Sequence, residues 1–186
     1  MQDAQRALRL IRAQARDFQL DPARLGVLGF SAGGHLMGLA ATRFGEAHDP
    51  PLDAISHQSA RPTAAALIYP VITLLPPYEH TSTRRVLVGD HPDAALSRAW
   101  SVETGVNADC PPVFLLQAAD DPISNPANTE RMFEACRRAG VPVERHLLPS
   151  GGHGFGMGRS DGPTAQWPLS LASWMHGTLG TRDSGR

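Results

Sequence analysis

The chain has 186 residues, of which 41% are hydrophobic and 19% charged, and its formal net charge is −1. This length suits one domain large enough to bury a core, and the composition is ordinary for a globular protein. Basic residues are not concentrated in any stretch, so we expect neither a nucleic-acid partner nor an anionic-membrane partner.

No run of about 18 apolar residues occurs, so the sequence predicts no membrane span. Residues 1–18 carry arginines at helical spacing in place of the apolar run and cleavage site of a signal peptide. We therefore expect a cytoplasmic protein, with export left open if the natural chain is longer at its N-terminus. Of the two cysteines, Cys136 lies in an apolar helical stripe, which favours a reduced thiol in the core.

The first part of the chain predicts a helix, a strand and a second helix. Apolar periodicity indicates an amphipathic helix over residues 3–18, whose buried face carries Leu8, Ile11, Ala15 and Phe18. Residues 25–30 form a continuously apolar run, which is typical of a buried parallel strand. Residues 32–44, rich in alanine and leucine, follow as a helix.

The alternation continues to the end of the chain. Further strands are predicted at residues 65–69, 112–117 and 143–148, and further helices at 126–139 and 167–179. Asn125 is the expected N-cap of the first of these helices, and the second is expected to face inward with Trp167, Leu171, Trp174 and Met175. This order is typical of an α/β fold with a mostly parallel sheet of about four strands flanked by helices.

We expect a single domain over residues 1–180. Within it, residues 73–108 form a small excursion with short helical pieces around 83–88 and 92–99. Residues 181–186 are expected to be a flexible tail.

One motif, Gly29-Phe30-Ser31-Ala32-Gly33, stands between the first predicted strand and the helix after it. A serine hydroxyl becomes a useful nucleophile when a sharp turn presents it, unobstructed, to a base. Such a turn strains the serine backbone, so small residues such as Gly29 and Gly33 are expected on either side. The turn also places the N–H of Ala32 at a helix N-terminus, where it can donate to a developing oxyanion. The alternative is a glycine-rich turn that only packs closely or binds phosphate.

Two later loops hold an acid and a histidine in the order serine, acid, histidine. Asp120 and Asp121 follow the third strand, and His153 follows the fourth in a glycine-rich loop. A histidine at that edge of the sheet can reach Ser31 with one nitrogen and an aspartate with the other. One of the two aspartates is then the acid, and the other is a turn or cap residue.

The other histidines lack the spacing of metal ligands, so the sequence predicts no metal site. His35 stands one turn into the helix that follows Ser31. It is therefore a candidate for lining the site.

Four stretches together resemble the acetyl-esterase and xylan-esterase-like branch of the α/β-hydrolases, near the hormone-sensitive-lipase-like esterases. They are residues 24–35, 67–72, 111–123, and 140–146 together with 151–156. The resemblance favours Asp121 as the acid, because in this family the acid usually stands two residues before a Val or Ile, here Ile123. It also implies hydrolysis of short acyl esters, with acetyl groups on plant polysaccharide as a candidate substrate.

The chain departs from this family upstream of Ser31. Such enzymes normally carry several strands and a His-Gly-Gly-Gly-like oxyanion loop there, and this sequence has one helix. Only the N–H of Ala32 is then identifiable as an oxyanion donor. The strand at 25–30 would also be an apolar sheet edge, so we expect a homo-oligomer that covers it.

The sequence thus predicts a serine esterase in which Ser31 attacks, His153 moves the proton, Asp121 orients His153 and Ala32 holds the oxyanion. The expected substrate is a small acyl ester, with an acetylated saccharide as a candidate, and no cofactor is expected to be required. Two alternatives stay open: a prolyl-oligopeptidase-like peptidase, and a non-catalytic hydrolase module that acts in binding or assembly.

Overall fold

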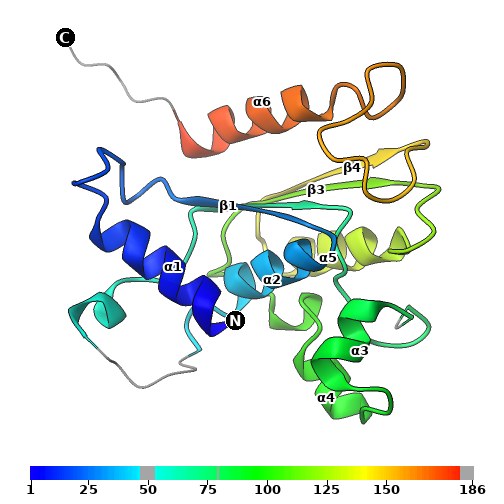
Figure 1. The fold of residues 1–186 in the computed structure, drawn as a ribbon, viewed down its shortest axis with the longest axis horizontal. Coiled ribbons are helices and arrows are strands. Elements are labelled where there is room, and N and C mark those ends of the chain that lie inside the picture. The colour runs from blue at the N-terminus through cyan, green and yellow to red at the C-terminus, as the bar shows by residue number, and fades with distance from the viewer. Residues whose placement is uncertain (47–52, 79, 181–186) are drawn as a thin grey trace.

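The computed structural model describes residues 1–46, 53–78 and 80–180, drawn in colour in Figure 1. Within them the strands are β1 (Gly26–Phe30), β2 (Ala64–Ile68), β3 (Val113–Ala118) and β4 (Val143–Leu148). The α-helices are α1 (Gln2–Ala13), α2 (Ser31–Thr42), α3 (Ser82–Val88), α4 (Ala94–Ala99), α5 (Ala127–Arg138) and α6 (Trp167–Leu179). Two short 3₁₀ helices lie at Ala54–His57 and Glu103–Gly105.

The four strands form one sheet in the order β1-β2-β3-β4, and every neighbouring pair is parallel. Helix α6 lies on one side of this sheet, and α1, α2 and α5 lie on the other (Figure 1). Helices α3 and α4 belong to the excursion between β2 and β3 and lie apart from the sheet. The predicted α/β fold with about four parallel strands is confirmed.

The two central strands carry the core on both of their faces, as their largely apolar sequences predict. On the side of α2 and α5 the buried cluster includes Leu39, Leu67, Val113, Leu115 and Met132. On the side of α6 it includes Ala66, Phe114, Leu116, Trp167 and Leu171. Both cysteines are free and buried, and burial raises the pKa of Cys136 to about 12.

The first helix is shorter than its periodicity predicts. It ends at Ala13, and the N–H of Leu20 then bonds to the carbonyl of Ala15 across a turn in which Gln19 has a φ of 55°. The turn directs Phe18 into solvent, where the side chain is 61% exposed, so its assignment to the buried face was wrong.

The last helix has the predicted bounds, and Trp167 and Leu171 are buried. Met175, however, is exposed, which corrects the expectation that it faces inward. Trp174 packs on Phe114 at a centroid distance of 5.5 Å, and Met175 lies about 100° further around the helix, at the margin of the contact face.

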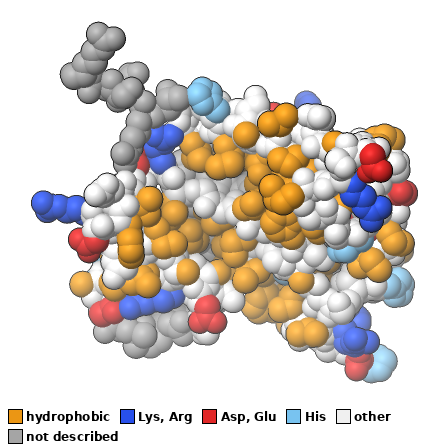
Figure 2. All heavy atoms as spheres, turned by 45° about the horizontal axis from the view of Figure 1, so that its top comes forward, with side chains coloured by type: hydrophobic (Ala, Val, Ile, Leu, Met, Phe, Trp, Pro, Cys, Tyr) orange, Lys and Arg blue, Asp and Glu red, His pale blue; other side chains and the backbone are white. Residues whose placement is uncertain are grey.

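In the described chain β1 pairs only with β2 and is therefore an edge strand. Leu28 shares the α6 side of the sheet with Phe30, whose ring contacts Trp167, and its side chain is 46% exposed. Hydrophobic side chains are spread over this face of the molecule (Figure 2).

No helix in residues 1–46, 53–78 or 80–180 is long and apolar enough to cross a membrane. The expected tail at 181–186 lies outside the described residues.

Candidate active site

Ser31 stands where β1 turns directly into α2. Phe30 is still extended, with φ −114° and ψ 137°, and Ser31 is already the first residue of the helix. The backbone of Ser31 has a φ of 52°, a region that non-glycine residues rarely adopt and that costs about 1–3 kcal/mol. The expected strained strand-to-helix turn is therefore present at this residue.

The turn needs a glycine on its strand side. A Cβ on Gly29 would lie 2.3 Å from the carbonyl oxygen of Gly33, so any larger residue would push strand and helix apart. Gly33, in contrast, has open space around its Cβ position, which corrects the expectation that it must be small. Gly34 takes that role, because a Cβ there would lie 2.8 Å from Pro70.

The structure brings Ser31, His153 and Asp121 together, although the first two are 122 positions apart in the sequence. The Oγ of Ser31 lies 2.8 Å from Nε2 of His153, and Nδ1 of His153 lies 2.8 Å from Oδ2 of Asp121. The side chain of Asp121 is fully buried, and that of His153 is 15% exposed. The three residues follow β1, β4 and β3 because carboxyl ends of parallel strands meet at one edge of the sheet.

The partners of His153 determine its tautomer. An ionised carboxylate can only accept, so the Nδ1 facing Asp121 carries the proton and donates it. Nε2 of the neutral ring then has a free lone pair, and the hydroxyl of Ser31 donates to it. In this arrangement the imidazole is ready to receive the proton of Ser31.

The two neighbouring aspartates have different tasks. Oδ1 of Asp121 accepts the N–H groups of Ile123 and Ser124, both at 2.9 Å, while Oδ2 faces His153. Asp120 is exposed and accepts the N–H groups of Gly151 and Gly152 in the loop that carries His153. Asp121 is thus the acid within reach of the histidine, and Asp120 holds the histidine loop.

Tyr69 is a residue of this site that the sequence analysis missed. It follows β2, adopts a φ of 37° and is 4% exposed. Its ring lies 4.9 Å from that of His153, and its hydroxyl accepts the N–H of Gly156 at 3.3 Å. Burial raises the pKa of Tyr69, so the phenol stays neutral. The one available signal was its position at the end of a strand beside the other site residues.

Ala32 is in the first turn of α2, where main-chain N–H groups have no intrahelical acceptor. Its side chain lines a hollow of about 340 Å³ between α2 and α3, together with Leu36, Val86, Leu87 and Trp100. No second oxyanion donor is identified among the described residues upstream of Ser31, which contain only α1 and β1.

His35 also lines this hollow, but the structure does not join it to Ser31 or His153. The ring is 2% exposed, and its Nδ1–H donates to the carbonyl of Val71 at 3.0 Å. Its Nε2 has no hydrogen-bond partner in the described residues. Burial lowers the pKa of His35 to about 4, so the ring is neutral at pH 7.

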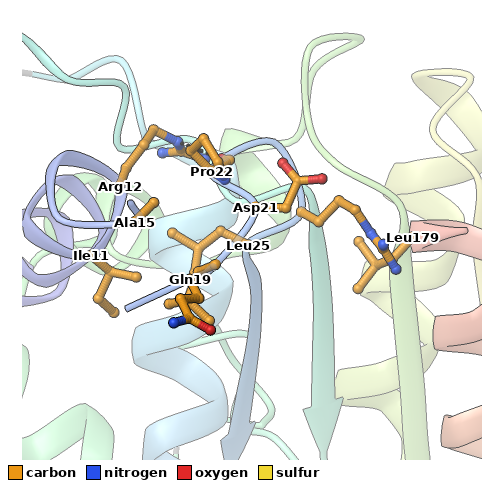
Figure 3. Close-up of a pocket in the computed structure, with 10 residues that line it drawn as sticks. Ile11, Arg12, Ala15, Gln19, Asp21, Pro22, Leu25 and Leu179 are labelled. Atoms are coloured by element: carbon orange, nitrogen blue, oxygen red, sulfur yellow. Dashed lines mark hydrogen bonds between the residues drawn. The ribbon is translucent and has the colours of Figure 1, made fainter. Parts of the chain in front are cut away.

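A second hollow, of about 350 Å³, lies at the opposite end of β1. Figure 3 shows Ile11 of α1, Ala15 in the turn after it, Leu25 before β1 and Leu179 of α6 around it. None of the residues that line it belongs to the group around Ser31. It is therefore separate from the candidate active site.

Residues 1–135 match the family model described as BD-FAE. The chain is 29% identical over 177 residues to an acetylxylan esterase of Xylanibacter ruminicola, an alignment that covers 93% of this chain and 34% of that protein. The chain thus spans about a third of the length of this curated relative.

Two solved structures have the same fold. An acetyl ester-xyloside bifunctional hydrolase from Caldicellulosiruptor lactoaceticus is 36% identical with a TM-score of 0.79, over 95% of this chain and 62% of that one. An α/β hydrolase from a Medee basin deep-sea metagenome library is 24% identical with a TM-score of 0.68, over 95% of this chain and 63% of that one. With the family match over most of its length, the chain belongs to the BD-FAE family and is an esterase-like α/β hydrolase.

Proposed function

We propose that this chain is a serine esterase that hydrolyses short acyl esters at Ser31. The observation that carries the proposal is the pair of 2.8 Å hydrogen bonds from Ser31 to His153 and from His153 to Asp121. A strained nucleophile turn, a neutral imidazole and a buried carboxylate are the parts that acyl transfer needs.

In the proposed reaction Oγ of Ser31 attacks the ester carbonyl carbon, and Nε2 of His153 takes its proton. Asp121 keeps the imidazole oriented and balances the charge of the imidazolium. His153 then gives the proton to the leaving alcohol oxygen as the bond from carbonyl carbon to that oxygen breaks. Water attacks the acyl-enzyme by the same route, which releases the acid and restores Ser31.

The N–H of Ala32 is the donor that we assign to the oxyanion, because it lies at the helix N-terminus next to the nucleophile. A single donor stabilises the tetrahedral intermediate less than a pair, since removal of one donor costs on the order of 10²–10³ in kcat in other enzymes. We therefore expect a modest turnover from the 186-residue chain.

For the substrate we propose acetyl esters, with acetylated xylan or its oligosaccharides as the natural class. The support is similarity to proteins named for acetylxylan and acetyl ester-xyloside hydrolysis. We expect the chain to release acetate from acetylated xylo-oligosaccharides. Among matched p-nitrophenyl esters, we expect it to hydrolyse the acetate faster than esters of longer acyl groups. A preference for a short peptide amide would favour the peptidase alternative.

The test of the function is Ser31→Ala. We expect hydrolysis of p-nitrophenyl acetate to fall by at least about 10³-fold and fluorophosphonate labelling to disappear. The matched control is Ser173→Ala, at an exposed serine of α6, which should keep both the hydrolysis of the ester and the labelling. Undiminished hydrolysis in Ser31→Ala would reject the assignment. A wild-type chain that neither hydrolyses the ester nor takes the label would favour the non-catalytic alternative.

We also propose that a second copy of the chain covers the open edge of β1. The support is that β1 pairs only with β2 in the described chain and that Leu28 is exposed beside it. An unpaired apolar edge favours association, and two identical edges can pair around a two-fold axis.

A further inference from the structure

Gln117 is a buried amide in an otherwise apolar strand. It is the fifth residue of β3, and its side chain is completely buried. A buried amide without partners costs roughly 1–3 kcal/mol by protein measurements, so its hydrogen bonds must offset that cost. The residue stands four positions before Asp121, which places the amide beside the carboxylate of the candidate active site.

The amide of Gln117 contacts both the carboxylate and the turn that follows it. Its Nε2 lies 3.4 Å from Oδ2 of Asp121, the oxygen that also accepts from His153. The same Nε2 donates to the carbonyl of Ser124. Ser124 in turn donates its own N–H to Oδ1 of Asp121. One amide therefore binds the carboxylate directly and through the turn that holds its other oxygen.

A second set of contacts surrounds Oε1 of the amide. The guanidinium of Arg145 can only donate, and its Nε lies 3.1 Å from Oγ1 of Thr129. The hydroxyl of Thr129 therefore accepts from Arg145, and its hydrogen can go to Oε1 of Gln117, 3.0 Å away, or to the carbonyl of Pro126, 3.1 Å away. Since the carboxylate of Asp121 and the carbonyl of Ser124 can only accept, the NH₂ group of Gln117 faces them and Oε1 faces Thr129. An ion pair of 2.7 Å between Arg145 and Glu130 holds the far end of this chain of contacts.

We infer that Gln117 is a positioning residue, whose amide holds the carboxylate of Asp121 in the orientation that His153 needs. The inference rests on the proposed function of Ser31, His153 and Asp121. Without the amide, Oδ2 of Asp121 keeps a single donor, and the carbonyl of Ser124 is left unpaired in a buried turn. The carboxylate can then rotate away from Nδ1 of His153, and the imidazole loses its fixed tautomer and direction.

The test is Gln117→Met, which keeps the length of the side chain and removes the amide. We expect kcat for p-nitrophenyl acetate to fall about 10-fold with KM within about twofold, because orientation at the reacting atoms is lost and substrate binding is not. The downfield proton NMR signal of His153 Nδ1–H, which reports the bond to Asp121, should move or broaden.

The control for a purely structural effect is Asn128→Ala. Asn128 is equally buried and accepts the N–H groups of Ile72 and Thr73, at 2.8 and 3.0 Å, without a hydrogen bond to the carboxylate of Asp121. It should lower the unfolding midpoint while kcat and the NMR signal stay as in the wild type. If Gln117→Met behaves in the same way, Gln117 is a structural residue and the inference is wrong.

Thr129→Val is the second variant, and it decides the matter if Gln117→Met does not fold. It removes the hydroxyl that orients the amide, so we expect a decrease in kcat of about threefold and a shifted His153 signal. An unchanged kcat and signal would overturn the inference. If the Gln117 and Thr129 variants keep the wild-type kcat while Ser31→Ala is inactive, the inference alone is refuted. If Ser31→Ala keeps its activity, the proposed function is refuted.

Discussion

Asp120 accepts the main-chain N–H of Gly152 at 2.8 Å, and the same oxygen accepts that of Gly151 at 2.9 Å. Gly151 and Gly152 both have positive φ, as do Gly154, Gly156 and Gly158 of the same loop. Such a loop has many accessible conformations when it is not tied, so the two hydrogen bonds hold His153 in reach of Ser31.

We therefore expect Asp120→Ala to lower kcat/KM for p-nitrophenyl acetate by about 10-fold, with kcat carrying most of the change. Asp17→Ala, at an exposed aspartate of the turn after α1, is the control and should leave kcat/KM unchanged. A loss smaller than about twofold in Asp120→Ala would mean that the loop holds its shape without this carboxylate.

Asp121→Asn is expected to have a far larger effect than the same change at Asp120. An amide in place of the carboxylate can present its NH₂ group to Nδ1 of His153, which favours the wrong tautomer, and it gives no charge to an imidazolium. We expect kcat to fall by about 10³–10⁴, measured under saturating substrate, with KM little changed. Asp120→Asn keeps an oxygen acceptor for Gly151 and Gly152 and should stay within about fivefold of the wild type. Similar losses in both variants would contradict the division of tasks between the two aspartates.

The order of strands and helices was predictable because both central strands are apolar except at Gln117 and turn residues separate most of the elements. The ends of elements were less predictable, since they depend on contacts that periodicity does not report. Phe18 continues the apolar stripe of the first helix, yet the chain must leave that helix at Ala13 to reach β1.

The candidate site was predictable as far as its motifs reached. Ser31, His153 and the Asp120-Asp121 pair each follow a strand, and parallel strands bring those ends together. Tyr69 and Gln117 were missed because the sequence does not show what they contact: their importance comes from lying beside His153 and Asp121 in space. Gly34 was missed for the same reason, since only the fold places Pro70 against it.

Gly29→Ala and Gly33→Ala form a matched pair within the turn at Ser31. The new methyl group at Gly29 would lie 2.3 Å from a backbone oxygen that cannot move without shifting α2, so we expect a loss of roughly 3 kcal/mol or more in the free energy of unfolding. The methyl group at Gly33 meets open space, and alanine favours a helix, so unfolding should become harder by about 0.5–1 kcal/mol. Urea denaturation of the two variants measures both values. Equal destabilisation would show that the strand and helix do not approach as closely as the structure has them.

The buried His35 predicts how stability depends on pH. Its pKa is lowered from 6.5 to about 4 in the folded chain, so between these values the unfolded chain binds a proton that the folded chain does not. The contribution of neutral, buried His35 to the free energy of unfolding is therefore fully present above pH 6.5 and is lost as the pH falls toward 4. It amounts to at most about 3 kcal/mol.

His35→Asn keeps an N–H donor for the carbonyl of Val71 and cannot take up the proton. Its unfolding free energy should fall less steeply than that of the wild type between pH 6.5 and pH 4, although other groups titrate in both proteins. Urea denaturation at several pH values gives the two slopes. Parallel curves would mean that His35 is protonated as easily in the folded chain as in the unfolded one.

The open edge of β1 predicts that two copies of the chain associate. Leu28 is 46% exposed on a strand that pairs on one side only in the described chain. We therefore expect the wild-type protein to form a dimer at micromolar concentration. Light scattering after gel filtration measures its mass. Leu28→Arg puts a charge on that edge and should return the mass to that of one chain without loss of helical signal. Leu169→Arg, at a leucine of α6 that is 68% exposed, is the matched control and should leave the dimer intact. If the wild-type chain already has the mass of a single copy, no second copy covers the edge; if Leu169→Arg also separates the copies, they meet across α6 and not along β1.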